Sequence, residues 1–323
     1  MTRGLFAMLV VVFSVLALGS TIRIFSVRRG VKFGDVQPSL AQQRMDSLRQ
    51  WWWLLIAFSL ALLFGKIGLA VLFCAAGLVG LYEFHTIFAR RSADSAWPCV
   101  LVGLVAIVHY SLITTVDSSW TQPSMISALF FGLMLQQVFG GRIRDYLRTT
   151  AGYFWAALLL VIGLSHAVLL CGLPVSVNAW NAGVVGWTLY LMLLTECNDI
   201  AQALIGRRFG KTKIIPSVSP GKSWAGLLGG MLVTALLAMC LAAPLTTFLQ
   251  ARPLGQGLAI AALSGVLISI AGFLGDVNIS ALKREAHLKD SSHLFPGMGG
   301  MLDRLDSLTL AAPVFFYLAR TLA

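Results

Sequence analysis

Ten apolar runs, each near the length that crosses a lipid bilayer, occupy most of the 323-residue chain. A membrane-spanning helix needs about 20 predominantly apolar residues. The runs are 4–22, 51–65, 67–88, 97–116, 122–139, 152–173, 183–205, 224–248, 257–279 and 305–321. Only Gly65 and Lys66 separate the second run from the third, so this pair could instead form a re-entrant hairpin. The sequence predicts an all-α, polytopic membrane helix bundle with about 8–10 transmembrane helices.

The composition supports a lipid environment. Only 11% of the residues are charged, whereas 58% are hydrophobic. A soluble domain has about 25% charged residues, so this chain has too little polar surface to cover a water-soluble globule. Its five cysteines lie singly in or beside the apolar runs and form no C-x-x-C pair. We interpret them as small packed residues rather than zinc ligands.

The formal net charge of +11 is distributed unevenly among the loops. One alternating set of loops contains every Lys and Arg except Arg3, Lys66, Arg252 and Arg320. In multi-pass proteins, basic residues gather in cytoplasmic loops, where they also meet anionic lipid headgroups. We therefore expect a protein of the cell (inner) membrane with both termini outside and with loops 206–223 and 280–304 on the cytoplasmic face. Because the basic residues are spread among loops between apolar runs, the charge does not favour a nucleic-acid partner.

The chain divides into two predicted regions. Residues 1–180 form N-terminal transmembrane helices with a cytoplasmic loop at 23–50, whose mixture of Arg, Gln and apolar residues indicates a helix lying on the membrane surface. Residues 181–323 form a catalytic membrane region that contains the basic loop 206–223 and the charged segment 276–306.

Carboxylates within the apolar runs are the first candidate functional groups. Glu196 and Asp199 lie at i, i+3 near the cytoplasmic end of the seventh run. An ionised group in mid-membrane costs about 2.5–3.5 kcal/mol on insertion scales, so such groups usually face a cavity or a partner; a pair satisfied by neighbouring hydroxyls is the alternative. Glu83 and His85 are a candidate polar pair near the end of the third run.

The basic loop 206–223 combines cations with hydroxyl groups. Its candidate ligand-binding residues are Lys211, Ser217, Ser219 and Lys222. Guanidinium, ammonium and hydroxyl donors suit a polyphosphate. An ordinary positive-inside loop is the alternative.

The segment 276–306 concentrates charge between two apolar runs. If the ninth run continues as a helix, Asp276, Ser280, Lys283 and Arg284 share one face. A Pro- and Gly-rich break at 296–300 then lets backbone N–H groups approach a ligand closely. Asp303 and Asp306 follow at i, i+3. Carboxylates at two helix ends can share a hard cation such as Mg²⁺, which bridges to phosphates.

At these residues the sequence resembles the phosphatidate cytidylyltransferase (CDP-diacylglycerol synthase) family. The signature of that family is matched by Ser280, Lys283, Arg284, Lys289, Asp290, Ser292, Pro296, Gly299, Gly300, Asp303, Arg304 and Asp306. Further matching blocks are Gly275-Asp276, Ser217-Val-Ser-Pro-x-Lys-Ser-Trp224, and Asn198-Asp199 followed by Gly206 and Phe209-Gly-Lys211. The resemblance is strongest from about residue 190 to 310.

The resemblance implies that CTP and a lipid phosphate, phosphatidate, give CDP-diacylglycerol and pyrophosphate. Asp276 and Asp303 would hold Mg²⁺, and Asp199 and Asp306 would support it or bind a second cation. Lys283, Arg284, Lys289 and Arg304 would contact phosphates as the catalytic cations. Substrate binding would involve Lys211, Ser217, Ser219, Lys222, Ser280, Asp290, Gly299 and Gly300. Membrane lipids are expected partners, and a homodimer is one expectation for the oligomeric state, which the sequence leaves open.

Two departures from the family pattern keep alternatives open. Met298 stands where the family has His, and Ala225 stands where Glu is expected. The alternatives are a divergent cytidylyltransferase that acts on a different lipid phosphate, and a membrane transporter of ions or solutes. A transporter would need a polar path across the whole bilayer, whereas the acidic groups of this chain concentrate at one face.

Overall fold

The computed structural model describes residues 2–32, 38–89, 96–116, 120–141, 145–250 and 252–322. Its elements are α1 (Arg3–Lys32), α2 (Pro38–Leu63), α3 (Gly65–Ala89), α4 (Trp97–Thr115), α5 (Thr121–Phe139), α6 (Tyr146–Ala157), a π-helical stretch (Leu158–Gly163), α7 (Leu164–Leu169), 3₁₀ turns at Leu170–Gly172 and Gly183–Val185, α8 (Gly186–Phe209), α9 (Trp224–Leu245), α10 (Leu254–Glu285) and α11 (Leu302–Leu322). The described residues contain no β-strand, only the isolated bridges Lys213–Ser223 and Phe295–Gly299.

Six helical spans among the described residues are long and apolar enough to cross a membrane: Arg3–Arg29, Gly65–Phe88, Trp97–Thr115, Tyr146–Gly172, Trp224–Leu245 and Leu254–Glu285. The remaining predicted runs are also helical but carry more polar residues, such as Glu196 and Asp199 in α8. The chain is an all-α, polytopic membrane helix bundle, as the hydropathy pattern predicts.

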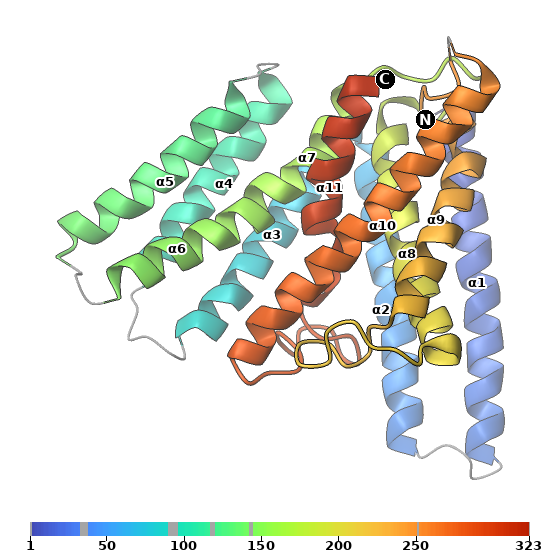
Figure 1. Cartoon of the computed structure of the whole chain (residues 1–323), viewed down its shortest axis with the longest axis horizontal. Coiled ribbons are helices and arrows are strands. Elements are labelled where there is room, and N and C mark those ends of the chain that lie inside the picture. Colours follow the sequence, from blue (N-terminus) through green and yellow to red (C-terminus); the bar gives the residue numbers. More distant parts are fainter. Residues whose placement is uncertain are drawn as a thin grey trace.

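The helices alternate in direction, so the connections fall at two ends of the bundle (Figure 1). Both termini lie at one end, together with the α2–α3 turn and the segments before α8 and α10. The basic loop 206–223 lies beside residues 286–301 at the other end; these residues are the part of the charged segment 276–306 that connects α10 to α11. The predicted sharing of one end by these two loops is confirmed. Arg90, Arg91, Arg142 and Arg144, which contributed to that prediction, lie outside the described residues.

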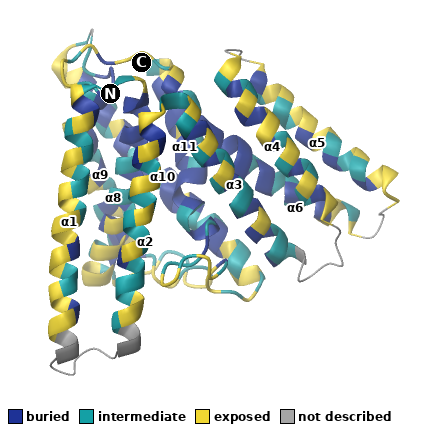
Figure 2. Cartoon of the chain, turned by 180° about the vertical axis from the view of Figure 1, so that it is seen from behind, coloured by how far each residue is buried: buried dark blue, intermediate teal, exposed yellow. Residues whose placement is uncertain are grey.

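The core is formed by α8, α11 and the continuous stretch from α6 to α7, which are the most buried parts in Figure 2. An aromatic group of Trp187, Tyr190, Phe248 and Phe315 packs between α8 and α11, with Tyr190 and Phe315 stacked at 5.4 Å. At the opposite end, α10 and α11 approach closely at Gly275, where a Cβ would lie 2.2 Å from the backbone oxygen of Asp306. Small residues allow such close helix contacts in membrane bundles.

The runs 51–65 and 67–88 lie in two long helices, α2 and α3, which meet at a turn where Gly65 adopts φ +62°, so the open alternative of a short re-entrant hairpin is not favoured. One local prediction is wrong: segment 23–50 is not a separate surface helix, because residues 23–32 continue α1 and residues 38–50 begin α2. Residues 33–37 between them lie outside the described part. The start of α2 contacts the charged segment, since the turn at Gly297 lies against the backbone of Gln43 and Ser47.

Candidate functional site

Helix α10 carries the polar face that the sequence predicts. It runs without a break from Leu254 to Glu285 and extends past its apolar part. Asp276, Ser280 and Lys283 lie along one side, and Ser280 Oγ donates a hydrogen bond to Asp276 Oδ1 at 3.1 Å. The helix ends next to His287, which adopts φ +57°. On this face, Lys283 contacts one group of side chains and Asp276 contacts another.

The first partner of this face is Asp303, at the first turn of α11. Lys283 Nζ lies 2.5 Å from Asp303 Oδ1. The other carboxylate oxygen accepts hydrogen bonds from Ser291 N at 2.9 Å, Ser291 Oγ at 2.8 Å and Gly300 N at 2.9 Å. Burial raises the pKa of Asp303, but the hydrogen bonds from Lys283, Gly300 and Ser291 outweigh it and hold the pKa below its ordinary value.

Glu83, near the end of α3, forms hydrogen bonds to the same part of the charged segment and to the start of α11. Its oxygens accept hydrogen bonds from Ser292 Oγ at 2.6 Å and Ser291 Oγ at 3.0 Å. They also accept the backbone N–H groups of Met301 and Leu302, both at 2.9 Å, at the start of α11. Glu83 is only 4% exposed. We call Glu83, Lys283, Asp303, Ser291 and Ser292 the clamp.

Glycine is required where the clamp closes. Gly299 adopts φ +85°, and a Cβ there would lie 2.5 Å from Asp303 Oδ2. A Cβ on Gly300 would lie 2.2 Å from Ser291 Oγ and 2.5 Å from Glu83 Oε2. We predicted from the sequence that the backbone N–H groups of this turn would bind a ligand. In the structure the Gly300 N–H donates to Asp303 instead, so these two glycines shape the clamp.

The second group of carboxylates comprises Asp199 of α8, Asp276 of α10 and Asp306 of α11; we call it the acidic cluster. The charge of Asp306 interacts with those of Asp276 and Asp199. Ser307 Oγ donates to Asp199 Oδ2 at 2.7 Å and contacts Asp306 Oδ1 at 3.5 Å. Ser307 therefore links Asp199 to Asp306 within the cluster.

Lys222 connects the basic loop to the acidic cluster. Its Nζ lies 2.6 Å from Asp276 Oδ2 and 5.5 Å from the centroid of the Phe273 ring. The next residue, Ser223, caps α9 by accepting a hydrogen bond from Gly226 N at 3.2 Å. This cap fixes the end of the basic loop at the start of the helix. Lys222 therefore places a positive charge beside the acidic cluster.

A buried polar network supports α8 behind the cluster. Asn198 Oδ1 accepts hydrogen bonds from Gln202 at 3.1 Å, Thr234 at 3.3 Å and Ser269 at 2.6 Å. Its Nδ2 donates to Asp199 Oδ1 at 3.3 Å. Asn198 is fully buried, and these bonds join α8, α9 and α10 beside Asp199.

The remaining predicted cations differ in their surroundings. Arg284 is exposed and donates to Val218 O at 3.1 Å and Leu288 O at 3.2 Å, so it ties the charged segment to the basic loop. Arg304 interacts with the charges of Glu196 and Asp306, and its Nε is buried without a hydrogen-bond partner in the described structure. Lys211, Ser217, Lys289 and Asp290 are exposed, and Ser219 is half-buried.

The four predicted metal ligands do not form one group. Asp303 belongs to the clamp, whereas Asp199, Asp276 and Asp306 form the acidic cluster. Among the described residues, no three His, Cys, Asp or Glu side chains lie close enough together to hold a metal ion by themselves. Mg²⁺ is commonly bound through one or two carboxylates together with substrate phosphates. The all-oxygen donors of the cluster fit that mode of binding.

Sequence reasoning missed the role of Glu83. We predicted a pair between Glu83 and His85, but His85 instead forms a hydrogen bond with the Tyr153 hydroxyl. The available signal was a carboxylate near the end of an apolar run. Ser291 and Ser307 were also missed as site residues, because nothing local in the sequence distinguishes them. Asn198 belongs to a block that matches the family, but it was not predicted as a site residue.

Several known proteins are similar to this chain. It is 37% identical over 273 residues to "Uncharacterized protein YnbB" of Escherichia coli, covering 84% of this chain and 86% of that protein. It is 43% identical over 129 residues to a phosphatidate cytidylyltransferase of Haemophilus influenzae, covering 40% of this chain and 44% of that protein. A phosphatidate cytidylyltransferase of Rickettsia bellii is 28% identical over 222 residues, which cover 68% of this chain and 88% of that protein.

The chain matches less than half of the length of the Haemophilus enzyme, so this alignment does not assign the activity of that enzyme to this chain. The sequence profile described as "Cytidylyltransferase family" matches residues 45–322, which include the clamp and the acidic cluster. The chain therefore belongs to the cytidylyltransferase family of nucleotidyltransferase enzymes.

Proposed function

We propose that this protein transfers the cytidylyl group of CTP to the phosphate of phosphatidate, giving CDP-diacylglycerol and pyrophosphate. The observation that carries the proposal is the ion pair between Lys222 and Asp276, which joins the basic loop to the acidic cluster at one end of the bundle. Cations that suit a triphosphate and carboxylates that suit a hard cation meet there, at the end of an otherwise apolar helix bundle.

The reaction needs no strong base, because a lipid phosphate already carries a nucleophilic oxygen. That oxygen forms a bond to the α-phosphorus of CTP, while the bond from the α-phosphorus to the bridging oxygen of the β-phosphate breaks. Pyrophosphate leaves with the electron pair. Positioning and charge stabilisation are the protein's main contributions.

The cations of the site have distinct places in this scheme. Lys222 is next to the acidic cluster and is positioned to neutralise a phosphate oxygen. The buried Nε of Arg304 needs an acceptor, which a phosphate oxygen supplies. Arg284 holds the two loops together through Val218. The exposed Lys211 and Lys289 lie on those loops and would attract the anionic nucleotide.

Mg²⁺ would be held by one or two carboxylates of the acidic cluster (Asp199, Asp276 and Asp306) together with the substrate phosphates, and a second cation could use the remaining carboxylate. The metal would supply positive charge between the bound phosphates. Asp303 is left out of the metal site in this proposal, because Lys283, Ser291 and Gly300 already occupy its oxygens.

The protein would lie in the inner membrane with the basic end of the bundle on the cytoplasmic side, as the positive-inside rule predicts. CTP would then arrive from the cytoplasm, and the lipid would arrive from the inner leaflet. Family membership favours nucleotidyl transfer over the transporter alternative.

The decisive assay uses the full-length protein in nanodiscs with CTP labelled at the α-phosphate and a panel of lipid phosphates that includes phosphatidate. We expect label in a CDP-lipid together with an equal amount of pyrophosphate. Label transfer to another lipid phosphate but not to phosphatidate would identify the divergent alternative. Absence of CTP consumption with every lipid would refute nucleotidyl transfer.

Asp145→Asn is a matched control for carboxylate substitutions in this assay. Asp145 precedes α6 with φ +55°, a backbone conformation that Asn tolerates, and it lies outside the site.

A further inference from the structure

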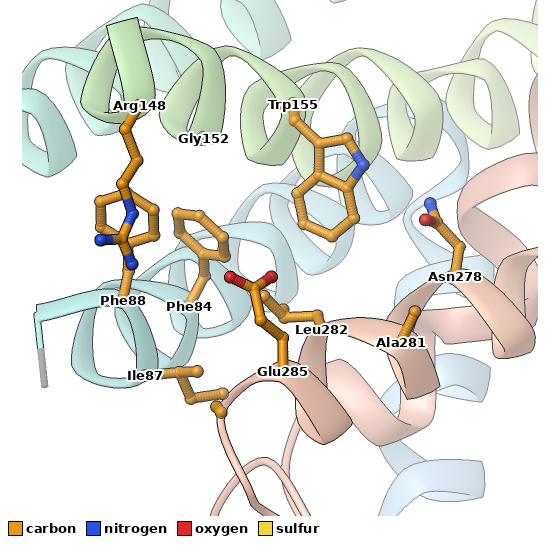
Figure 3. A pocket seen from close by; sticks show the side chains of 11 residues that line it. Phe84, Ile87, Phe88, Arg148, Gly152, Trp155, Asn278, Ala281, Leu282 and Glu285 are labelled. Atoms are coloured by element: carbon orange, nitrogen blue, oxygen red, sulfur yellow. The ribbon is translucent and has the colours of Figure 1, made fainter. Parts of the chain in front are cut away.

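A cavity of about 320 Å³ lies between α3, α6 and α10 (Figure 3). This volume is in the range of ligand pockets, which are mostly apolar with a few placed polar groups. Its apolar walls include Phe84, Ile87 and Phe88 of α3, Trp155 of α6 and Leu282 of α10. The described lining residues include none of the candidate site residues.

The cavity and the candidate site lie on opposite sides of α10. Side chains rotate by about 100° per residue around a helix. Asn278 and Leu282, which line the cavity, therefore point away from the face that carries Asp276, Ser280 and Lys283. A molecule in the cavity would not occupy the space of the acidic cluster.

The aromatic walls are packed against one another. Phe84 and Phe88 stack with ring centroids 5.4 Å apart, and Trp155 lies 5.8 Å from Phe84. Gly152 allows α6 to approach, because a Cβ there would lie 2.7 Å from the Phe88 ring. A rigid apolar slot of this kind suits a hydrocarbon chain.

Arg148 supplies a cation at the edge of this slot. It is exposed, and its guanidinium carbon lies 5.5 Å from the centroid of the Phe88 ring. Among the described residues, no carboxylate forms an ion pair with Arg148. Glu285 also lines the cavity, but it already takes part in an interaction within the chain, so we assign it no ligand. The guanidinium N–H groups of Arg148 therefore remain donors for an anion.

The cation and the slot are arranged along the direction that crosses the membrane. Arg148 lies in the first turn of α6, at the basic end of the bundle, where lipid headgroups would lie (Figure 1). From there the lining follows α6 to Trp155 and α10 from Glu285 back to Asn278, away from the basic end. Seven residues of helix rise about 10 Å. The cavity thus combines a cation at headgroup level with an apolar slot that extends toward the hydrocarbon region.

We propose that this cavity binds one membrane phospholipid through its phosphate. The phosphate contacts the guanidinium of Arg148, and part of one acyl chain lies along Phe84, Trp155 and Leu282. Guanidinium–phosphate hydrogen bonds are charge-assisted, and basic pockets between membrane helices on the cytoplasmic side bind lipid headgroups. Glu285 has no role in this binding, and the binding does not require the proposed reaction.

The lipid site shares its walls with the clamp. Phe84 follows Glu83 on α3, and Leu282 precedes Lys283 on α10. A lipid that orders these two walls also restrains the two helices that hold the charged segment. We therefore expect the lipid to raise the unfolding temperature of the protein.

Trp155 provides a signal that is specific to the slot, because brominated acyl chains quench the fluorescence of a tryptophan that they touch. The chain has nine tryptophans, so the difference between the unmodified protein and Trp155→Phe isolates this one. The test titrates the full-length protein in maltoside detergent with phosphatidylglycerol carrying brominated chains and, separately, with diacylglycerol carrying the same chains. We expect half-maximal quenching of Trp155 at a concentration of phosphatidylglycerol at least about fivefold lower, equivalent to roughly 1 kcal/mol.

Soluble glycerophosphate distinguishes a lipid site from a site for a free phosphate compound. Because it lacks the chain, an excess of it should relieve little of the quenching by brominated phosphatidylglycerol. Complete relief would overturn the lipid site in favour of a phosphate site without a chain slot.

Two variants divide the contributions. Arg148→Gln should raise the concentration of phosphatidylglycerol needed to that of diacylglycerol, because the phosphate loses its partner. Ala281→Phe fills the slot and should abolish quenching of Trp155 by either lipid. Arg320→Gln is the matched control for Arg148, since Arg320 lies 6.0 Å from the Phe316 ring at the other end of the bundle. Leu274→Phe, at an exposed position two turns away on α10, is the control for Ala281→Phe.

Equal quenching of Trp155 by phosphatidylglycerol and diacylglycerol in the unmodified protein would overturn the proposal. So would an unchanged advantage of phosphatidylglycerol in Arg148→Gln. If Arg148→Gln does not fold, Ala281→Phe decides the outcome alone, because it changes no charge. Quenching that persists in Ala281→Phe as it does in Leu274→Phe would exclude the chain from the slot.

Discussion

The clamp and the acidic cluster are both built from carboxylates at the same end of the bundle, yet their surroundings are opposite. In the clamp, Glu83 and Asp303 each accept four hydrogen bonds or ion-pair contacts. Among the described residues of the acidic cluster, Asp276 contacts Lys222 and Ser280, Asp199 accepts from Ser307 and Asn198, and Asp306 accepts from Ser307. Carboxylates with four donors each stabilise a loop, whereas carboxylates with fewer donors that repel one another favour a cation.

The largest expected effect separates the two groups by activity. Asp276→Asn should lower CDP-lipid formation by at least about 100-fold, because it removes charge from the acidic cluster. The unfolding temperature should change little, because the relief of repulsion from Asp306 offsets the loss of the ion pair with Lys222. The measurement is label transfer from CTP together with thermal unfolding in detergent. A variant with the activity of the Asp145→Asn control would remove Asp276 from the site.

The second prediction concerns stability. Glu83→Gln should reduce the free energy of unfolding by about 2–4 kcal/mol, because an amide cannot accept all four donors of the clamp. The unfolding temperature should fall by roughly 5–10 °C. Ser292→Ala removes one donor and should have a smaller effect, and combining the two changes should be less than additive. Full additivity would show that Glu83 does not act through Ser292.

The third prediction tests whether Asp303 belongs to the clamp or to the metal site. Asp303→Asn should reduce the free energy of unfolding by about 1–3 kcal/mol, because Lys283 loses its buried counter-ion. The Mg²⁺ concentration for half-maximal activity should stay the same. A large rise in that concentration, with unchanged unfolding, would restore Asp303 as a metal ligand.

The fourth prediction follows from the lowered pKa of Asp303. Because its pKa is lower in the folded state, its contribution to stability is complete above the unfolded-state pKa of about 3.9 and is lost as the pH falls through the folded-state value. Unfolding temperatures measured from pH 7 downward should therefore drop more steeply in acid for the unmodified protein than for Asp303→Asn. Parallel curves would contradict this assignment.

The smallest expected effect concerns the departure at Met298. Its backbone N–H bonds to Phe295 O at 2.9 Å, so the turn is formed without the His that is typical of the family. Met298→His should raise kcat/KM for CTP by a few-fold, by about 0.5–1 kcal/mol, because imidazole can contact a phosphate and a thioether cannot. A fall in activity without a change in unfolding would show that the turn is adapted to methionine.

The sequence predicted the parts of this fold that depend on local pattern. Apolar runs marked the helices, and loop charges placed loops 206–223 and 280–304 at one end. Helical spacing placed Asp276, Ser280 and Lys283 on one face of α10. The division at residue 180 and a homodimer remain predictions. Glu83 lies in the predicted N-terminal region but contacts the charged segment, so the two predicted regions share the clamp.

Contacts between distant segments could not be predicted in this way. Glu83 and Leu302 are 219 positions apart, and neither has a local feature that indicates the other. Asp303 and Asp306 lie one helical turn apart and look alike in sequence, but burial against Lys283 and Ser291 separates their roles. Such differences depend on packing, which spacing within one helix does not encode.

The position of Glu83 also sets an order for assembling the protein. Chains are made from the N-terminus, so α3 enters the membrane long before its partners at Ser291, Ser292, Met301 and Leu302 exist. An early carboxylate at the membrane boundary must stay hydrated or find temporary partners until α11 is in place. We therefore expect the charged segment to take its final shape only when the last helix docks on the third, and catalytic competence to be a late event in biogenesis.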